Sequence, residues 1–130
     1  MAEMSNFLEN ALLNATLNAT TYTAPATVYV SLWTSDPTDA GSGTEVSGGS
    51  YARTAVSFAT ASGTSGNVLN DADVTFPTAT GSWGTVGWIG INDAATSGNL
   101  LYHTALDTAK AIDSGDIFKI STGNLSVTLA

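Results

Sequence analysis

The chain has 130 residues and a formal net charge of −8, because three Lys or Arg residues stand against eleven Asp or Glu residues. Nucleic acids and anionic membranes are bound by clustered cations, so this composition predicts neither as a partner. The absence of cysteine excludes disulfides and thiolate metal sites. The length favours one domain, spanning residues 1–130, that buries a full hydrophobic core.

The surface is expected to be polar but weakly charged. Charged residues make up 11% of the chain, against about 25% in typical globular domains. Thr, Ser, Asn and Gly take their place. Because few ions must lose their hydration at a contact, such a surface suits close packing against other protein subunits.

A single helix is predicted at the start of the chain, over residues 5 to about 18. Ser5 can cap its first turn. Two interpretations of its apolar face stay open: the face packs on the chain's own sheet, or it docks on a neighbouring subunit. The residues that form this face at helical spacing are Met4, Phe7, Leu8, Ala11, Leu12 and Ala15.

Short β-strands are predicted over residues 26–130. Residues 85–92 are apolar on both faces, which indicates a central strand covered on both sides, with Trp88 in the core. Gly123 and Asn124 predict a hairpin turn between the last two strands. The predicted fold is mainly β: an antiparallel β-sandwich or barrel-like domain of about seven or eight strands with one N-terminal α-helix. The strand ranges are 27–33, 51–59, 67–76, 85–92, 100–106, 108–112, 116–121 and 125–129.

Residues 34–50 form a long Gly-containing loop without periodicity, and loops of this length are often functional or mobile. Arg53, the single arginine, follows it. It makes either a local salt bridge or a contact that orders this loop at a subunit boundary. Trp83 lies among Gly and Ser residues and is the best candidate for an exposed or interface ring. The predicted interface residues are Asp36, Asp39, Glu45, Tyr51, Arg53 and Trp83.

No catalytic residue, cofactor or metal ligand is predicted. His103 is the single histidine; it lies in a predicted strand and no Gly-x-Ser-x-Gly nucleophile motif occurs, so we expect a structural or surface role. Two acidic pairs lie in turn-like segments where nothing would raise a carboxyl pKa for catalysis. One of them, Asp71 with Asp73, leaves a Ca²⁺ site open as an alternative.

Several stretches spread over most of the chain match a known pattern. The two most specific are TSDPTDAG at residues 34–41 and EVSGGSYAR at residues 45–53. With these stretches the chain resembles a family of small virion structural proteins of tailed bacteriophages. Members are often labelled tail fibre proteins, and some resemble capsid cement or decoration proteins. The other stretches are residues 8–17, 25–30, 74–77, 83–86 and 98–102.

The resemblance implies a non-enzymatic virion protein. Together with the residues themselves, it leaves three hypotheses of function. The first is a capsid cement or decoration subunit on the capsid exterior, which binds the major capsid protein and copies of itself as a small oligomer and stabilises the shell. The alternative is a tail or fibre component that binds a host-surface glycan through exposed aromatics and long loops. The third and weakest is a small hydrolase built on His103.

Overall fold

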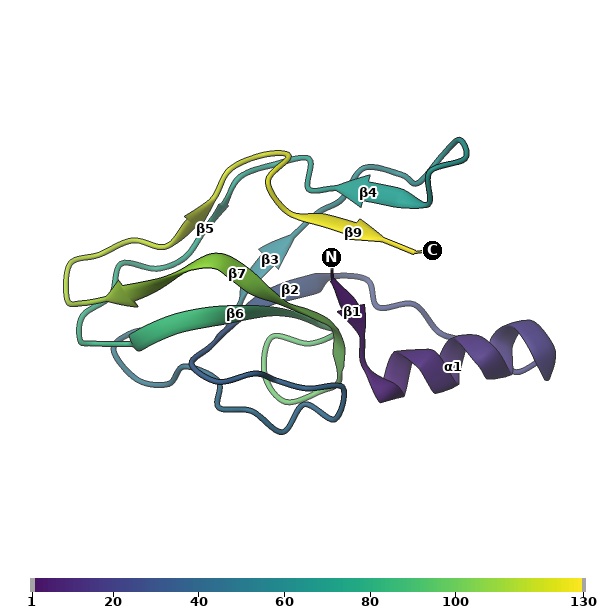
Figure 1. The fold of residues 1–130 in the computed structure, drawn as a ribbon, viewed down its shortest axis with the longest axis horizontal. Coiled ribbons are helices and arrows are strands. Elements are labelled where there is room, and N and C mark those ends of the chain that lie inside the picture. Colours follow the sequence, from purple (N-terminus) through teal and green to yellow (C-terminus); the bar gives the residue numbers. More distant parts are fainter. Residues whose placement is uncertain (1, 130) are drawn as a thin grey trace.

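The computed structural model describes residues 2–129 and has two β layers with one helix at the side (Figure 1). The larger layer is a five-stranded antiparallel sheet in the order β1-β7-β6-β2-β3. Two antiparallel pairs, β4 with β9 and β5 with β8, form the other layer. The predicted mainly β, antiparallel fold is therefore confirmed. The strands are β1 (Glu3–Met4), β2 (Val28–Trp33), β3 (Thr54–Val56), β4 (Asn67–Leu69), β5 (Val74–Thr75), β6 (Gly84–Asn92), β7 (Leu100–Ile112), β8 (Lys119–Ile120) and β9 (Ser126–Thr128).

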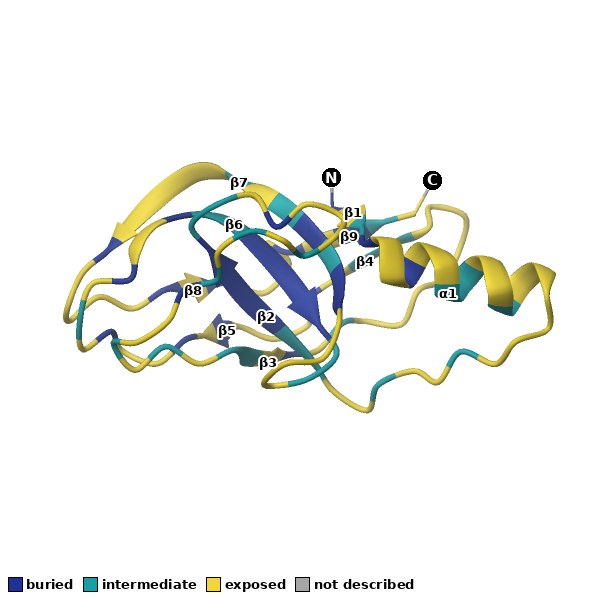
Figure 2. Cartoon of the chain, turned by 90° about the horizontal axis from the view of Figure 1, so that it is seen from below, coloured by how far each residue is buried: buried dark blue, intermediate teal, exposed yellow. Residues whose placement is uncertain are grey.

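The hydrophobic core lies between the two layers. Strands β2 and β6 supply its centre and are largely buried (Figure 2). Phe76 and Phe118 from the smaller layer meet edge to face, with ring centroids 5.6 Å apart, a favourable aromatic geometry. The other large contributors to the core are Val30, Leu32, Val74, Val86, Ile89, Ile91, Ile120, Leu125 and Val127.

The pairing of β6 with β7 is interrupted opposite Gly87, where Val86 pairs with Lys110 and Trp88 with Ala105, so the extra residues lie in β7. The register between β6 and β7 shifts between Val86 and Trp88. Strict alternation would put Val86 and Ile89 on opposite faces, but both lie in the core, one on each side of this interruption. Trp88 is only half-buried and lies outside the core cluster, so its prediction as a core residue is wrong. The other face of the sheet is thereby left free to build a separate site.

Helix α1 (Asn6–Leu17) has the predicted bounds and the predicted cap. The Ser5 side chain accepts a hydrogen bond from the backbone N–H of Leu8 at 3.2 Å. The helix contacts β7 and extends away from the β layers (Figures 1 and 2), and Leu8 is its buried residue. Ala11, Leu12 and Ala15 of its apolar face are half-buried, whereas Phe7 is exposed, and Leu17 farther along the helix is 75% exposed. Among the described residues, no helix has the length and apolarity needed to cross a bilayer.

Two strand predictions fail at the same place, around Asn70. Residues 67–76 form two strands rather than one, because the buried Asn70 side chain turns the chain between β4 and β5. Its amide donates to the carbonyls of Ala72 and Ser121, and its oxygen accepts from the N–H of Leu125. These bonds also direct the chain between β8 and β9, which pair with β5 and β4 and not with each other. The predicted hairpin at Gly123 is therefore wrong.

Candidate functional site

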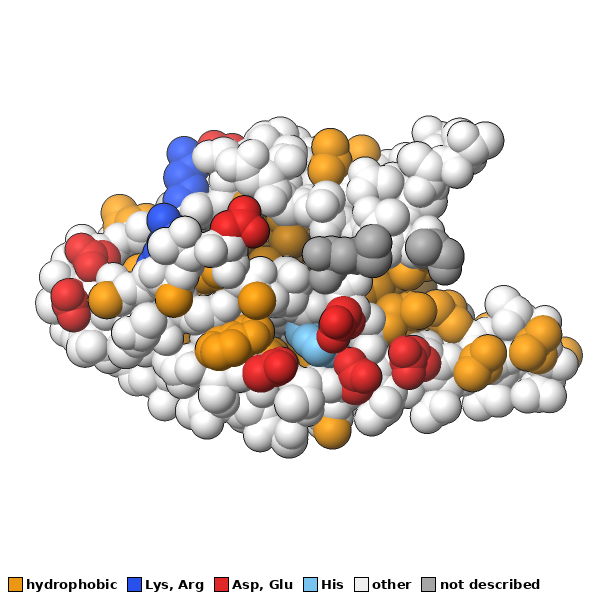
Figure 3. All heavy atoms as spheres, viewed as in Figure 1, with side chains coloured by type: hydrophobic (Ala, Val, Ile, Leu, Met, Phe, Trp, Pro, Cys, Tyr) orange, Lys and Arg blue, Asp and Glu red, His pale blue; other side chains and the backbone are white. Residues whose placement is uncertain are grey.

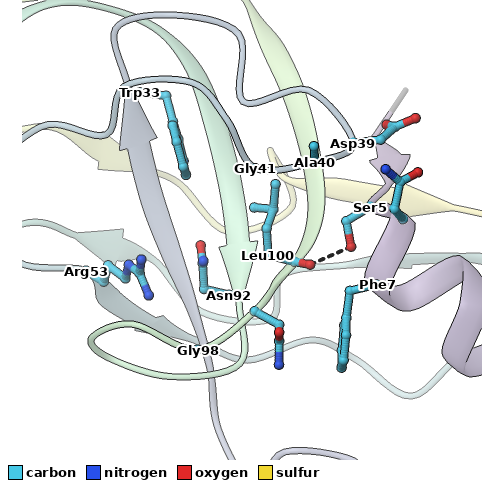
Figure 4. A pocket seen from close by; sticks show the side chains of 12 residues that line it. Ser5, Phe7, Trp33, Asp39, Ala40, Gly41, Arg53, Asn92, Gly98 and Leu100 are labelled. Atoms are coloured by element: carbon cyan, nitrogen blue, oxygen red, sulfur yellow. Dashed lines mark hydrogen bonds between the residues drawn. The ribbon is translucent and has the colours of Figure 1, made fainter.

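A cleft of about 270 Å³ opens on the face of the larger sheet that points away from the core (Figure 4). We call it the outer cleft. Its volume lies just below the range of about 300–1,000 Å³ usual for small-molecule sites. It combines two aromatic side chains with several polar ones, as binding sites for polar ligands do. Its lining residues are Ser5, Asn6, Phe7, Trp33, Asp39, Ala40, Gly41, Arg53, Asn92, Gly98, Asn99 and Leu100.

The floor of the outer cleft is a chain of hydrogen bonds across β2 and β6. Trp33 Nε1 donates to Ser31 Oγ at 2.8 Å, and Ser31 Oγ donates to Asn92 Oδ1 at 2.6 Å. The Asn92 amide nitrogen has no hydrogen-bond partner among residues 2–129, although the residue is only 3% exposed. In that part of the chain no fully buried side-chain nitrogen or oxygen lacks a partner, so this nitrogen reaches the cleft. Asn92 thus offers two N–H donors to a ligand.

Gly90 makes this floor possible, and its replacement gives a first prediction. A Cβ on Gly90 would lie 2.7 Å from Leu100 Cδ1 and 2.8 Å from Ser31 Oγ, inside contact distance. Gly90→Ala is expected to lower the free energy of unfolding by about 1–3 kcal/mol, the usual cost of overpacking. Gly87→Ala is the matched control, because its Cβ would meet its nearest neighbour at 3.9 Å. Urea denaturation of both variants checks this; equal losses would contradict the tight packing.

The start of α1 forms one wall. The backbone N–H of Ser5 donates to the carbonyl of Leu101 at 2.8 Å, and that of Asn6 to the carbonyl of Asp39 at 2.9 Å. The Ser5 hydroxyl donates to the carbonyl of Leu100. These bonds fix the first turn of the helix to β7 and to the 34–50 loop. They place Phe7, which is 42% exposed, beside the cleft opening (Figure 4).

The opposite wall is held by Arg53, which bridges two loops. Its guanidinium makes a two-bond contact with Glu45, at 2.9 and 2.8 Å. Its Nη1 donates to the carbonyls of Ala94 at 3.0 Å and Ser97 at 2.7 Å. The hydrogen bond with Glu45 raises the pKa of Arg53, so the cation is permanent. The local salt bridge is thus present, and it orders both the 34–50 loop and the loop after β6.

Tyr51 does not line the cleft but supports this wall through Glu45. Its hydroxyl donates to Glu45 at 2.6 Å and accepts from the backbone N–H of Leu32 at 3.0 Å. Burial, and then the hydrogen bond to Glu45, raise the pKa of Tyr51, which keeps the phenol neutral. Its ring also packs edge to face on Trp83, at 5.4 Å between centroids.

The structure brings together five of the six predicted interface residues. Arg53 and Asp39 line the outer cleft, Glu45 and Tyr51 support Arg53, and Asp36 lies near Asp39 around His103. The sixth, Trp83, is only 3% exposed, so its ring is a core residue and not an exposed one. Whether the other five contact a partner stays a prediction.

Other residues of the outer cleft carried no usable signal in the sequence. Phe7 fits the helical spacing of the apolar face, and that pattern does not indicate that it lies beside a cleft. Asn92 and Asn99 are ordinary polar residues at the ends of strands, where turns also need asparagine. Only the fold shows that β6 and β7 bring them beside Arg53.

The acidic pair Asp71 and Asp73 does not converge on a common point. Asp71 accepts a hydrogen bond from Ser57, and Asp73 accepts from the N–H and hydroxyl of Thr122 at 2.8 and 2.9 Å. The two hydrogen bonds from Thr122, and then the neighbouring Lys119, lower the pKa of Asp73. Each carboxylate is thus engaged by different protein donors, and the geometry does not favour Ca²⁺ there.

Comparison with known proteins identifies the family of the chain. The family described as podophage GP4 fiber I protein gp80 matches residues 3–128. The chain belongs to this family. No curated protein matches the chain.

Membership of the fiber I family makes the chain a fibre-type protein of the phage virion. The predicted phage virion class is therefore confirmed. The family description favours the fibre hypothesis over the capsid cement hypothesis, for which the comparison gives no support.

Proposed function

We propose that this chain is a non-enzymatic fibre component that binds a glycan of the host cell surface in the outer cleft. The observation that carries the proposal is the Asn92 amide, whose nitrogen reaches the cleft floor and has no hydrogen-bond partner among residues 2–129. Its two N–H groups are therefore free to donate to a ligand oxygen in the cleft.

The chemistry of the lining suits a sugar. Sugar hydroxyls both donate and accept hydrogen bonds, and the cleft supplies amide groups from Asn6, Asn92 and Asn99. Phe7 adds an exposed apolar ring at the opening, against which the C–H face of a sugar can pack. The volume of about 270 Å³ suits one sugar unit, with the rest of the glycan outside.

The net charge restricts the class of glycan. With eleven acidic residues against three basic ones, the chain repels strongly anionic polymers at a distance. Within the cleft, the guanidinium of Arg53 is already engaged by Glu45 and two carbonyls. A neutral sugar is therefore the ligand class we propose.

An array of bacterial surface polysaccharides tests this proposal. The purified chain is expected to bind at least one neutral glycan, and Phe7→Ala is expected to weaken that binding by about tenfold, as the loss of one packed ring requires. Leu17→Ala is the matched control, because Leu17 lies on the same helix, is 75% exposed and does not line the cleft. Absence of any bound glycan, or equal binding by Phe7→Ala and the wild type, would contradict the proposal.

Attachment to the particle must use another surface. The exposed apolar side of α1, with Leu13 at 54% and Leu17 at 75% exposure, is the candidate surface. Self-association through this face and contact with the major capsid protein stay predictions.

A further inference from the structure

One histidine and two carboxylates converge where β1, β7 and the 34–50 loop meet. His103 Nε2 is 2.8 Å from Asp39 Oδ1 and 3.9 Å from Glu3 Oε2. The three potential ligand atoms all lie within 4.8 Å of one another. Figure 3 shows the histidine side chain surrounded by acidic side chains at the surface. The sequence predicted no metal ligand here, because the three residues lie far apart along the chain.

We propose that Glu3, Asp39 and His103 bind a divalent transition-metal ion of the Zn²⁺ type. Nitrogen and oxygen ligands lie about 2.0–2.2 Å from Zn²⁺, so two ligands of one ion are about 3.0–3.5 Å apart. The separation of His103 from Asp39 is close to this range, and that of His103 from Glu3 is slightly above it. The Glu3 side chain is 72% exposed and can rotate the short distance required.

The backbone holds these ligands in place before any ion arrives. Strand β1 pairs with β7 so that Glu3 lies directly opposite His103, which puts both side chains on one face. The His103 side chain is 6% exposed and is fixed between β1 and β6. Asp39 comes from the loop whose carbonyl at that residue accepts the N–H of Asn6. Two of the three ligands are therefore positioned by the fold.

A second observation concerns the other nitrogen of the ring. Asp36 Oδ1 lies 4.0 Å from His103 Nδ1, on the side opposite Asp39 and Glu3. Histidines that bind metals usually direct their second N–H to a carboxylate, which favours the tautomer with a free lone pair on the metal side. At 4.0 Å the contact is too long for a hydrogen bond, so Asp36 supplies a negative charge on the Nδ1 side rather than a fixed partner for the second N–H.

The ligand set selects the type of ion. Ca²⁺ and Mg²⁺ prefer oxygen ligands alone, whereas imidazole together with carboxylates suits Zn²⁺ and neighbouring transition metals. Two carboxylates and a neutral imidazole carry a charge of −2, which a divalent cation neutralises. The exposed positions of Glu3 and Asp39 leave the remaining coordination sites to water.

The bound ion would act as a clamp on the N-terminal segment. Strand β1 has two residues and joins the sheet only through β7. A metal shared by Glu3, Asp39 and His103 would join it also to the 34–50 loop. Because Asp39 lines the outer cleft, the clamp would stiffen the cleft wall at the start of α1. The inference does not depend on glycan binding.

Thermal unfolding with added zinc tests the site. After treatment with EDTA and its removal, saturating ZnCl₂ is expected to raise the Tm of the wild type by about 5 °C or more. Glu3→Gln is expected to keep the metal-free Tm, because its side chain is exposed, and to lose most of the rise. Glu9→Gln, an exposed acid in the first turn of α1 outside the group, is the matched control and should respond like the wild type.

Titration calorimetry gives a second readout that does not depend on stability. One Zn²⁺ per wild-type chain is expected, and at least tenfold weaker binding for both Glu3→Gln and Asp39→Asn. An unchanged Tm of the wild type in zinc, or equal responses of Glu3→Gln and Glu9→Gln, would overturn the inference. Either result would indicate that His103 pairs with the surrounding carboxylates without a metal ion. Neither result affects the glycan test, which reads a different ligand.

Discussion

Arg53→Ala is expected to lower the free energy of unfolding by about 2–3 kcal/mol. The substitution removes the two-bond contact with Glu45 and the bonds to Ala94 and Ser97. Removing one partner of a fully buried ion pair costs about 3–5 kcal/mol. The expected loss of stability is smaller here because the Arg53 and Glu45 side chains are 11% and 22% exposed, so water screens part of the ion pair.

Two further variants isolate the cause. Arg53→Lys keeps the charge but not the planar fork, so it should recover only a minor part of the lost stability. Lys119→Ala is the matched control, since Lys119 pairs with Asp73 at 3.3 Å with both side chains about half exposed, and it should change stability little. Guanidinium denaturation measures all three. Equal losses for Arg53→Ala and Lys119→Ala would show that the bridge between the loops does not stabilise the fold.

Trp83→Ala should have a still larger effect, a loss of about 3–5 kcal/mol, which is the usual cost of removing a buried aromatic ring. The ring packs edge to face on Tyr51, and Trp83 Nε1 donates to the carbonyl of Gly49 at 2.9 Å. Trp83→Phe keeps most of the packing and loses that hydrogen bond, so a loss of about 1–2 kcal/mol is expected.

The same substitution at Trp88 provides the control. Trp88 is half-buried and outside the core cluster because it alternates with Ile89 and points away from the core. In urea titrations of both variants, Trp88→Ala should therefore lower the free energy of unfolding clearly less than Trp83→Ala does. The reverse order would mean that the two rings have the roles that the sequence pattern first indicated, with Trp88 in the core and Trp83 outside it.

These two tryptophans illustrate what could be predicted from the sequence. A cap and a repeat at helical spacing are local signals, and they predicted α1 almost to the residue. Alternation predicted that residues 85–92 form a central strand. Which of its two faces meets the core depended on the arrangement of the layers and on the interrupted pairing with β7 beside Val86, which alternation does not reveal. Trp83 lies among small residues, so its burial depends on Tyr51 and the 34–50 loop, which are distant in sequence.

The candidate site was harder to predict for the same reason. The loop containing Glu45 and the role of Arg53 as a salt-bridge partner were visible, because one arginine among many acids must find a carboxylate. The Asn92 amide and the group around His103 arise only when separate strands and a loop meet. Such convergence depends on strand order and register, which alternation does not specify.

The position of a bound glycan can be measured on the Asn92 side chain itself. NMR spectra of the ¹⁵N-labelled chain would be recorded during titration with a neutral glycan selected on the array. The side-chain amide signals of Asn92 and Asn99 should shift and saturate together, with the same midpoint as the binding curve. If those signals stayed fixed while backbone signals of β3 or β8 shifted, the glycan would bind elsewhere, and the outer cleft would not be the receptor-binding site of this fibre protein.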